Sequence, residues 1–336
     1  MSGIVAICAP ELNFPQICEG TAMILCCGEA LIDMLPCVDE QGKAGYVPHA
    51  GGAIFNTSIA LGRLGLEAGF LSGLSTDLFG GVIQTALAES GVNSSLSIYS
   101  DLPTTLAFVE LNDGHARYHF YDENTAGRML TNDQQSAIPK AVSAMYFGGI
   151  SLIVEPCGDF YLTLARRASQ DKVVMVDPNI RQSFIKDEDG YRARLDAIIA
   201  ICDILKVSDE DLNWIVPGTA SLAEKASSLK QKGPKVVVLT RGSEGASAFF
   251  GDAESVDVSA RKTEVVDTVG AGDTFNAGVL AGLSAANVLS KTGIANISKA
   301  AMADALSLGA RVASVTVSRS GANPPWAREL AELGPL

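Results

Sequence analysis

Residues 267–275 read DTVGAGDTF and place two glycines and an alanine directly before an aspartate. Small residues let the backbone turn sharply and let a ligand approach the main-chain N–H groups closely. The continuation FNAGVLAGLSAANVL predicts a helix, so the segment predicts a tight loop that leads into a helix amino terminus. Unpaired N–H groups and the helix dipole favour an anion there, which makes the carboxylate of Asp273 unexpected at this position.

Three interpretations compete for Asp273. In the first, it is a helix N-cap that accepts a main-chain N–H. In the second, the loop binds a dinucleotide, but Phe275 occupies the third small position and no acidic residue ends a strand about 20 residues later; the chain also has no G-x-x-x-x-G-K-[ST] sequence. In the third, the N–H groups from Gly270 to Asp273 hold a phosphoryl group in transfer, and Asp273 takes the proton from the attacking hydroxyl. Only the third interpretation accounts for both the small residues and the acid.

The composition and net charge of the chain limit which kinds of molecule it is expected to bind. Hydrophobic residues make up 47% and charged residues 19% of the 336-residue chain, so a large core is expected. The formal charge of −13 argues against nucleic acid and anionic membranes as partners, because both require a basic surface. It is compatible with a phosphorylated small molecule held by backbone amides. No apolar run approaches the length of a membrane span.

Cysteine and histidine usage predicts a cytoplasmic protein without a histidine-based site. The seven cysteines are odd in number and lack C-x-x-C spacing, which predicts reduced, buried thiols. The three histidines have no metal-ligand spacing. Residues 1–22 contain no Lys or Arg and so lack the basic region of a signal peptide. We expect these residues to form a loosely held extension, or Met23 to be the true start.

Strand and helix patterns alternate along most of the chain. Apolar runs such as VVMVD at 173–177 and VVVLT at 236–240 are typical of strands buried on both faces of a parallel sheet. Strands that alternate with helices predict a doubly wound α/β fold with a mostly parallel sheet, here as a single domain over residues 23–330. EAGFLSGLS at 67–75 is expected to be one of its strands.

Two stretches interrupt the alternation, at about 33–49 and 103–125. Both predict short antiparallel strands, and NDG between two alternating runs in the second stretch is a strong hairpin signal. Because neither piece is large enough to fold alone, we predict that together they form a small β-sheet lid over one end of the core. The lid leaves a sheet edge that needs cover, so a homodimer through the lid is expected.

Polar residues gather where the predicted strands end, and parallel α/β sheets bind ligands beyond the carboxyl ends of their strands. The residues at these positions are Asp33, Gly51 and Gly52 with Asn56, Glu155, Asp177 with Asn179 and Arg181, and Thr240 with Gly242. Each alone is compatible with a loop cap or a surface residue. Their convergence at one edge of the sheet predicts a binding site.

Two segments resemble the signatures of a known family. DTVGAGDTFNAG resembles the carboxyl-terminal signature of the PfkB, or ribokinase-like, carbohydrate kinases, and GGAIFNTSIALGRLG at 51–65 resembles their amino-terminal glycine signature. GEALIDMLP, GGISLIVEPC and VDPNIRQSFI are most similar to segments of bacterial fructokinases. The resemblance extends from about residue 24 to 328, and the two signatures at this spacing are highly specific.

The resemblance implies a role for each matching residue. Asp273 is the catalytic base, and Gly270, Ala271 and Gly272 form the anion hole for the transferred phosphoryl group. The residues implied on the sugar side are Asp33, Gly51, Gly52, Asn56, Phe120, Glu155, Asp177 and Arg181. Those implied on the ATP side are Ser208, Thr240, Gly242, Gly245, Gly272 and Asn296.

The resemblance also implies metal ions. KVSDEDL corresponds to the N-x-x-E element of the family, which helps to organise Mg²⁺ and phosphate, but here the two positions are Ser208 and Asp211. The shorter Asp211 is expected to act on Mg²⁺ through water. Asp267 and Gly321 lie where some members of the family bind K⁺.

The implied reaction is transfer of the γ-phosphoryl group of Mg-ATP to a primary hydroxyl of a monosaccharide, with fructose as the first expectation. 2-Keto-3-deoxygluconate is the nearest alternative, and its carboxylate calls for a cation such as Arg117 or Arg181. Ribose or a nucleoside comes third, with Phe108, Tyr118, Phe120 and Tyr121 as aromatic candidates for stacking on a base. A catalytically silent sugar or nucleotide sensor on the same fold is an alternative of a different class. The family often uses its lid as a dimer interface.

Overall fold

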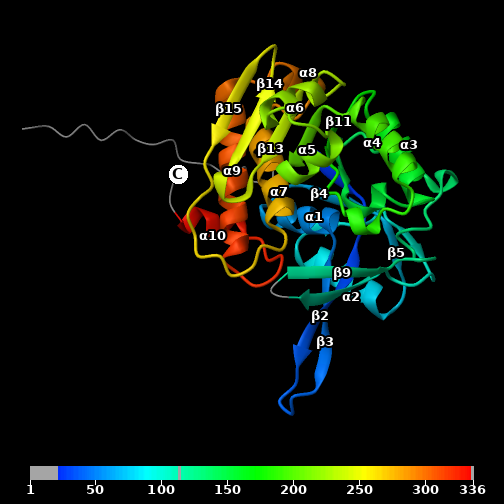
Figure 1. Ribbon diagram of the computed structural model, residues 1–336. Coiled ribbons are helices and arrows are strands. Elements are labelled where there is room, and N and C mark those ends of the chain that lie inside the picture. The colour runs from blue at the N-terminus through cyan, green and yellow to red at the C-terminus, as the bar shows by residue number, and fades with distance from the viewer. Residues whose placement is uncertain (1–21, 113–114, 334–336) are drawn as a thin grey trace, which may run out of the picture.

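The computed structural model describes residues 22–112 and 115–333, with the side chains of 111–117 left out (Figure 1). The predicted amino-terminal extension, residues 1–22, therefore lies almost wholly outside the described residues. The side chain of Arg117 lies outside them as well.

The main sheet of the described chain has nine strands in the order β15-β14-β13-β12-β11-β10-β1-β4-β6. They are β1 (Met23–Cys27), β4 (Ala68–Leu71), β6 (Val92–Asn93), β10 (Val142–Gly148), β11 (Val173–Asp177), β12 (Ile204–Ser208), β13 (Val236–Thr240), β14 (Ala246–Phe250) and β15 (Glu254–Val258). Neighbours from β6 to β13 are parallel, and β14 and β15 continue the sheet in antiparallel pairing. This is the mostly parallel sheet that the alternating pattern predicts.

Helices cover both faces of this sheet. The residues of β1 alternate between two cores, because Ile24 and Cys26 belong to one and Leu25 and Cys27 to the other. The first core is completed by α1 (Ala53–Arg63), α2 (Leu78–Glu89), α7 (Ala271–Ala285), α8 (Lys291–Ala295), α9 (Lys299–Val317) and α10 (Ala327–Glu332). The second is completed by α3 (Cys157–Ala168), α4 (Glu188–Ile199), α5 (Asp209–Ile215) and α6 (Leu222–Lys230). The predicted doubly wound α/β fold is confirmed.

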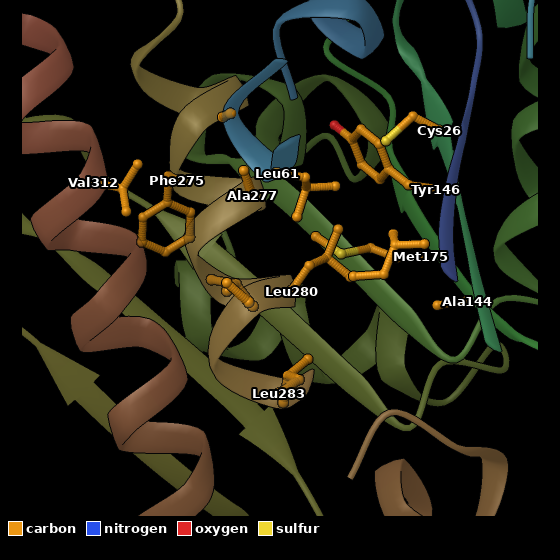
Figure 2. Close-up of a cluster of buried hydrophobic side chains, with 14 of the residues drawn as sticks. Cys26, Leu61, Ala144, Tyr146, Met175, Phe275, Ala277, Leu280, Leu283 and Val312 are labelled. Atoms are coloured by element: carbon orange, nitrogen blue, oxygen red, sulfur yellow. The ribbon is translucent and has the colours of Figure 1, made fainter. Parts of the chain in front are cut away.

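Helix α7 packs directly along α9, and Figure 2 shows its apolar side chains in the first core. Phe275 and Leu280 of α7 belong to this core together with Val312 of α9. The contact is close because it contains glycines: a Cβ on Gly278 would lie 2.6 Å from the Cα of Gly309. Helix α7, which carries Asp273 near its amino terminus, is therefore closely packed in the first core.

A second sheet of four strands lies beside the core, and we call it the lid sheet. Its order is β3-β2-β8-β9, with β2 (Leu31–Val38), β3 (Ala44–Gly51), β8 (Leu106–Asn112) and β9 (His115–Tyr121). β2 and β3 form one antiparallel hairpin, which projects from the body of the molecule in Figure 1, and β8 and β9 form another. The hairpins join through β2 and β8, which pair in parallel, and the long segment between them allows this direction.

Segment 67–75 differs from its prediction as a single strand. It contains β4 and a separate strand, β5 (Gly73–Ser75), which leaves the main sheet and pairs with β7 (Ile98–Ser100). Ser72 lies between the two strands and is fully buried. Periodicity alone does not show where a continuous apolar run changes its pairing partner.

The sequence predicted no segment long and apolar enough to span a membrane, and helix α9 is an exception to that prediction. Of the described helices it alone meets that test by length and composition. In the structure, however, 56% of the apolar window is buried inside the protein, where it packs on α7 and the edge of the sheet. We therefore interpret α9 as a core helix.

Candidate active site

A cavity of about 380 Å³ lies between the lid sheet and the carboxyl ends of the central strands. This volume is typical of a small-molecule site. The residues predicted for the site that line it are Asp33, Gly52, Asn56, Phe120, Arg181, Gly270, Ala271, Gly272 and Asp273. Asn179 from the predicted strand-end residues and Tyr118 from the predicted aromatic residues also line it, together with Glu29, Lys206 and Thr268. Residues far apart in the sequence thus share one cavity.

The amino terminus of α7 forms one wall of the cavity. Its N-cap is Gly270, whose φ of 76° is left-handed and therefore favours glycine. The helix begins at Ala271, so the predicted loop ends at Gly270 and the residues from Ala271 onwards already form the first turn of the helix. The N–H groups of Gly272 and Asp273 have no intrahelical acceptor, because an α-helix leaves its first donors unpaired. These donors suit an anion.

Asp273 is not an N-cap, which excludes the first interpretation of the sequence. No side chain caps α7. The carboxylate instead accepts hydrogen bonds from two side-chain amides: Nδ2 of Asn56 is 2.9 Å from Oδ2, and Nδ2 of Asn179 is 3.4 Å from Oδ1. Thr57 of α1 donates its hydroxyl to the main-chain carbonyl of Asp273 at 3.0 Å. The acid is therefore oriented into the cavity by α1 and by the loop after β11.

The pKa of Asp273 is raised to about 7, chiefly because burial disfavours the charged form. The hydrogen bond from Asn56 opposes this effect. The nearby carboxylate of Asp177 raises the pKa further, whereas the cations of Arg181 and Lys206 lower it. A carboxyl that titrates near neutral pH is suited to accept and release a proton.

A buried ion pair lies beneath the cavity. Nζ of Lys206 is 2.9 Å from Oδ2 of Asp177, and Nδ2 of Asn276 donates to the same oxygen at 2.7 Å. Burial by itself lowers the pKa of Lys206, but the ion pair with Asp177 outweighs it, so the pKa is raised and the side chain carries its charge. A Cβ on Gly272 would lie 3.4 Å from this ammonium, so the positive charge sits directly against the first turn of α7.

Glu29 caps α1 from a distant part of the chain. The N-cap of α1, Gly52, has no side chain to cap the helix. Oε1 of Glu29 accepts the N–H of Ala53 at 3.0 Å, and the carbonyl of Glu29 accepts the N–H of Phe55 at 3.3 Å. Burial raises the pKa of the Glu29 carboxyl. Because α1 carries Asn56, this contact helps to position the partner of Asp273.

The lid sheet contributes an acid and two aromatic rings. Burial raises the pKa of Asp33 to about 6, and the Arg181 guanidinium opposes the rise. The rings of Tyr118 and Phe120 are stacked, with centroids 6.0 Å apart, and Phe120 also contacts Phe184 at 4.7 Å. The cavity therefore combines hydrogen-bonding acids with an apolar cover.

Several predicted residues do not line the cavity. Gly51 pairs with Leu31 next to Asp33, and Asp177 lies below the cavity in the ion pair with Lys206. Glu155 turns to the surface, where it forms an ion pair with Arg194. These positions indicate supporting roles for Gly51 and Asp177. The side chain of Glu155 is not among those that line the cavity.

Most of the residues predicted for ATP lie at the same edge of the main sheet as the cavity, beyond the carboxyl ends of the next strands. Ser208 and Thr240 are paired neighbours at the ends of β12 and β13, and Gly242 and Gly245 follow in the next turn, both with positive φ. Ser208 is the N-cap of α5 and accepts the N–H of Asp211 at 3.0 Å. Oδ1 of Asp211 accepts the N–H of Ile180 at 3.1 Å, and burial raises the pKa of Asp211.

Asn296 lies apart from this group. It ends α8, and Lys291 at the start of the same five-residue helix forms an ion pair with Asp203 at 2.8 Å. Asp203 precedes β12, so it lies at the opposite end of that strand from Ser208. We therefore do not include Asn296 in the candidate site.

Asp267 and Gly321 are in contact although 54 positions separate them. Oδ2 of Asp267 accepts the N–H of Gly321 at 2.9 Å, and Oδ1 accepts the N–H of Val269 at 3.0 Å. The two residues predicted for K⁺ therefore lie together beside the loop before α7.

Sequence reasoning missed Glu29, Lys206 and Asn276. Two of them carried a signal: Lys206 interrupts the apolar strand ILKVS, and Glu29 follows the apolar strand MILCC after one glycine. A charge in such a position requires a buried partner or a function. Asn276 carried no comparable signal within its helix.

Residues 21–328 match the family model described as pfkB family carbohydrate kinase. A fructokinase of Rhizobium leguminosarum bv. trifolii is 47% identical over 280 residues, which cover 83% of this chain and 85% of that protein. Fructokinase-2 of Oryza sativa subsp. japonica is 31% identical over 260 residues, which cover 75% of this chain and 77% of that protein.

Solved structures share the fold. Fructokinase with bound ATP from Xylella fastidiosa matches with a TM-score of 0.84 at 25% identity, over 93% of this chain and 98% of that chain. A fructokinase from Vibrio cholerae O395 in a fructose, ADP and calcium ion bound form matches with a TM-score of 0.79 at 24% identity, over 90% and 95% of the two chains. The resemblance drawn from the two glycine signatures is confirmed, and the chain belongs to the pfkB family of carbohydrate kinases.

Proposed function

We propose that the chain is a fructokinase that transfers the γ-phosphoryl group of ATP to a primary hydroxyl of fructose. One observation carries the proposal: a buried carboxylate, Asp273, with a pKa of about 7, lies in the cavity beside the unpaired N–H groups of α7. The 47% identity to a fructokinase supports the choice of sugar. An acid and an anion site in one cavity are the two groups that this transfer requires.

In this proposal one residue transfers the proton and others stabilise the charge on the phosphoryl group. Asp273 accepts the proton of the sugar hydroxyl as its oxygen forms a bond to the γ-phosphorus, and the bond from that phosphorus to the bridging oxygen of ADP breaks. The N–H groups of Gly272 and Asp273 donate to the transferred oxygens, and the ammonium of Lys206 adds positive charge below them. Tyr118 and Phe120 cover the cavity and reduce the access of water, which would otherwise hydrolyse ATP.

Mg²⁺ fits this site as an ion held mainly by phosphate and water. Among the described residues, no group of three His, Cys, Asp or Glu side chains could cage a metal. Mg²⁺ commonly uses one or two carboxylates together with phosphate oxygens, and Asp211, next to Ser208, is the acid that we propose to hold it through water. When bound, the ion neutralises charge on the phosphates.

K⁺ is proposed beside Asp267 and Gly321. Each carboxylate oxygen of Asp267 accepts one main-chain N–H, and a carboxylate has about four acceptor positions. Acceptor capacity for a cation therefore remains. Activity measured in KCl and in NaCl of equal ionic strength tests this: stimulation by K⁺ is expected, and equal rates would contradict it.

The same cavity favours fructose over the keto-acid. Glu29 and Asp33 are acids in the cavity wall, and they suit hydroxyl groups better than a second carboxylate. Arg181, the cation predicted for a keto-acid, donates Nη1 to Oδ1 of Asn179 at 2.6 Å. A neutral polyol therefore matches the described side chains best.

We also propose a cytoplasmic homodimer that forms through the lid sheet. Tyr46, Phe108 and Tyr121 form a chain of edge-to-face aromatic contacts on the lid sheet, and the side chains of Tyr46 and Tyr121 are at least half exposed. Exposed aromatic clusters of this kind are typical of interfaces. The five described cysteines are free, which suits a reducing compartment.

The test is an ATP-consumption assay with Mg²⁺ and a panel of acceptors: fructose, 2-keto-3-deoxygluconate, ribose, glucose and adenosine. We expect kcat/KM for fructose to exceed the others at least about tenfold, roughly 1.4 kcal/mol of preference. A preference for the keto-acid would keep the mechanism and change the substrate. No turnover with any acceptor, together with retained binding of sugar or nucleotide, would favour the silent sensor.

A further inference from the structure

Asn179 has an unusual backbone conformation next to the catalytic base. Its φ of 43° is left-handed, a region that asparagine enters more readily than most residues but still at a cost. The N–H of Asn179 donates to Oδ1 of Asp177 at 3.2 Å, which ties the turn to the buried ion pair below it. The residue is therefore held in place from the floor of the cavity.

Both the oxygen and the nitrogen of the Asn179 side-chain amide have a partner. Nη1 of Arg181 donates to Oδ1 of the amide at 2.6 Å, and this contact leaves Nδ2 on the opposite side. Nδ2 then points at Asp273, 3.4 Å from Oδ1. Because a guanidinium only donates, it fixes which end of the amide faces the base.

The two oxygens of Asp273 thus have different partners. Asn56 of α1 binds Oδ2, and Asn179 of the loop after β11 approaches Oδ1. The contact to Oδ1 is the longer of the two, so Oδ1 is the oxygen that is less tightly hydrogen-bonded to the protein. Amide donors also favour the ionised form of a carboxylate.

We propose that Asn179 is a positioning residue for the base Asp273, and that Arg181 acts through it by fixing the orientation of its amide. This inference rests on the proposed function of Asp273. Its consequence is that the Asn179 amide favours the ionised form of the base and orients its Oδ1. Arg181 has this second role whether or not it also touches the sugar.

The pH dependence of activity reports this role. The charged and titratable groups that face Asp273 are Asp177, Lys206, Arg181, Tyr118 and Tyr146. Asn179 carries no charge, so its replacement changes a hydrogen bond and leaves this set intact. Loss of its donor raises the pKa of Asp273 and moves the acid limb of the kcat/KM profile to higher pH.

The variant to make is Asn179→Gly, because glycine accepts the left-handed backbone and removes only the side chain. We expect the acid limb to move up by about 0.5–1 pH unit, with activity largely recovered at high pH. Asn179→Asp keeps the shape and adds a negative charge, so its shift should be larger. The matched control is Asn287→Gly, an exposed asparagine with φ of 55° at the end of α7, which should leave the profile unchanged.

The role of Arg181 is tested by Arg181→Lys, which keeps the charge and loses the planar donor. This variant should shift the acid limb in the same direction. The double variant with Asn179→Gly should shift it no further than Asn179→Gly alone, because both changes act on one contact. An unmoved acid limb in Asn179→Gly, or a full additional shift from Arg181→Lys in that background, would overturn the proposal.

A readout independent of turnover separates this proposal from the proposed function. Infrared difference spectra against pH follow the carboxyl of Asp273, and the band that is absent in Asp273→Asn identifies it. If the wild-type protein phosphorylates no sugar, the proposed function fails, but an upward shift of this titration in Asn179→Gly still supports the positioning contact. An unchanged titration contradicts it.

Discussion

The amide of Asn56 donates to Oδ2 of Asp273 at 2.9 Å, although 217 positions separate the two residues in the chain. One residue belongs to the amino-terminal glycine segment and the other to the carboxyl-terminal segment. Helices α1 and α7 therefore meet at the point where the two signatures contribute to one site. This contact orients the carboxylate of Asp273, and it lowers the pKa of that carboxyl against the larger effect of burial.

Asp273→Asn should lower turnover by roughly 10³-fold, the scale of a positioned general base, and leave the affinity for sugar and ATP nearly unchanged. The amide keeps the size of the side chain but does not accept the proton. Calorimetry of both ligands together with a kinase assay measures the two effects separately. Near-normal turnover in this variant would remove Asp273 from the role of base.

The same substitution should stabilise the protein at neutral and higher pH. A carboxyl whose pKa rises from 3.8 to about 7 on folding costs the folded state on the order of 4 kcal/mol once it is ionised. The cost is absent below pH 3.8, where both states are protonated, grows up to about pH 7 and is constant above it. The Tm of Asp273→Asn should therefore exceed that of the wild type at pH 8 by more than at pH 5. A difference in Tm that does not grow with pH would contradict the raised pKa.

Lys206→Met should destabilise the protein by about 3–5 kcal/mol, because it leaves the carboxylate of Asp177 buried without its cation. Urea denaturation measures the change. The matched double variant Asp177→Asn with Lys206→Met removes both charges and should recover much of the loss. A double variant as unstable as Lys206→Met would show that the two side chains act separately.

Glu29→Ala should weaken α1 by about 1 kcal/mol, the usual scale of a lost cap. Because α1 holds Asn56, we also expect a higher KM for sugar and a lower kcat. Glu29→Gln keeps one acceptor for the N–H of Ala53. Its stability should therefore lie between that of the wild type and that of Glu29→Ala. Thermal denaturation and steady-state kinetics test this, and equal effects of both variants on stability would argue against capping by the oxygen.

We expect the lid sheet to form the interface of the dimer. Tyr121→Asp places a charge in the aromatic cluster with Phe108 and should shift the protein from dimer to monomer in sedimentation experiments. Leu333→Asp is the matched control, because Leu333 is 52% exposed at the end of α10 and lies outside the lid sheet. A wild-type protein that sediments as a monomer would contradict the proposed interface.

The sequence alone was sufficient to predict the α/β fold, the strands of the lid sheet and the helix that begins beside Asp273. The role of Asp273 as the base stays a prediction. Patterns of this kind are local, because apolar runs identify strands and two glycines before an acid identify a helix terminus. Three features were not predictable from the sequence: the change from the main sheet to a second sheet at Ser72, the parallel pairing of β2 with β8, and the position of Asn296. Each depends on contacts with distant segments.

Only the tertiary structure decided how the site is charged and held. The pKa of Asp273 follows from burial, and burial is a property of the packed chain. The ion pair of Lys206 with Asp177 and the cap that Glu29 provides to α1 each join different elements of the fold. The sequence by itself thus determined which chemical groups this protein carries and on which kinds of element they lie. Their distances, partners and proton affinities were decided by folding, because those quantities depend on the neighbours that close packing brings within a few ångströms.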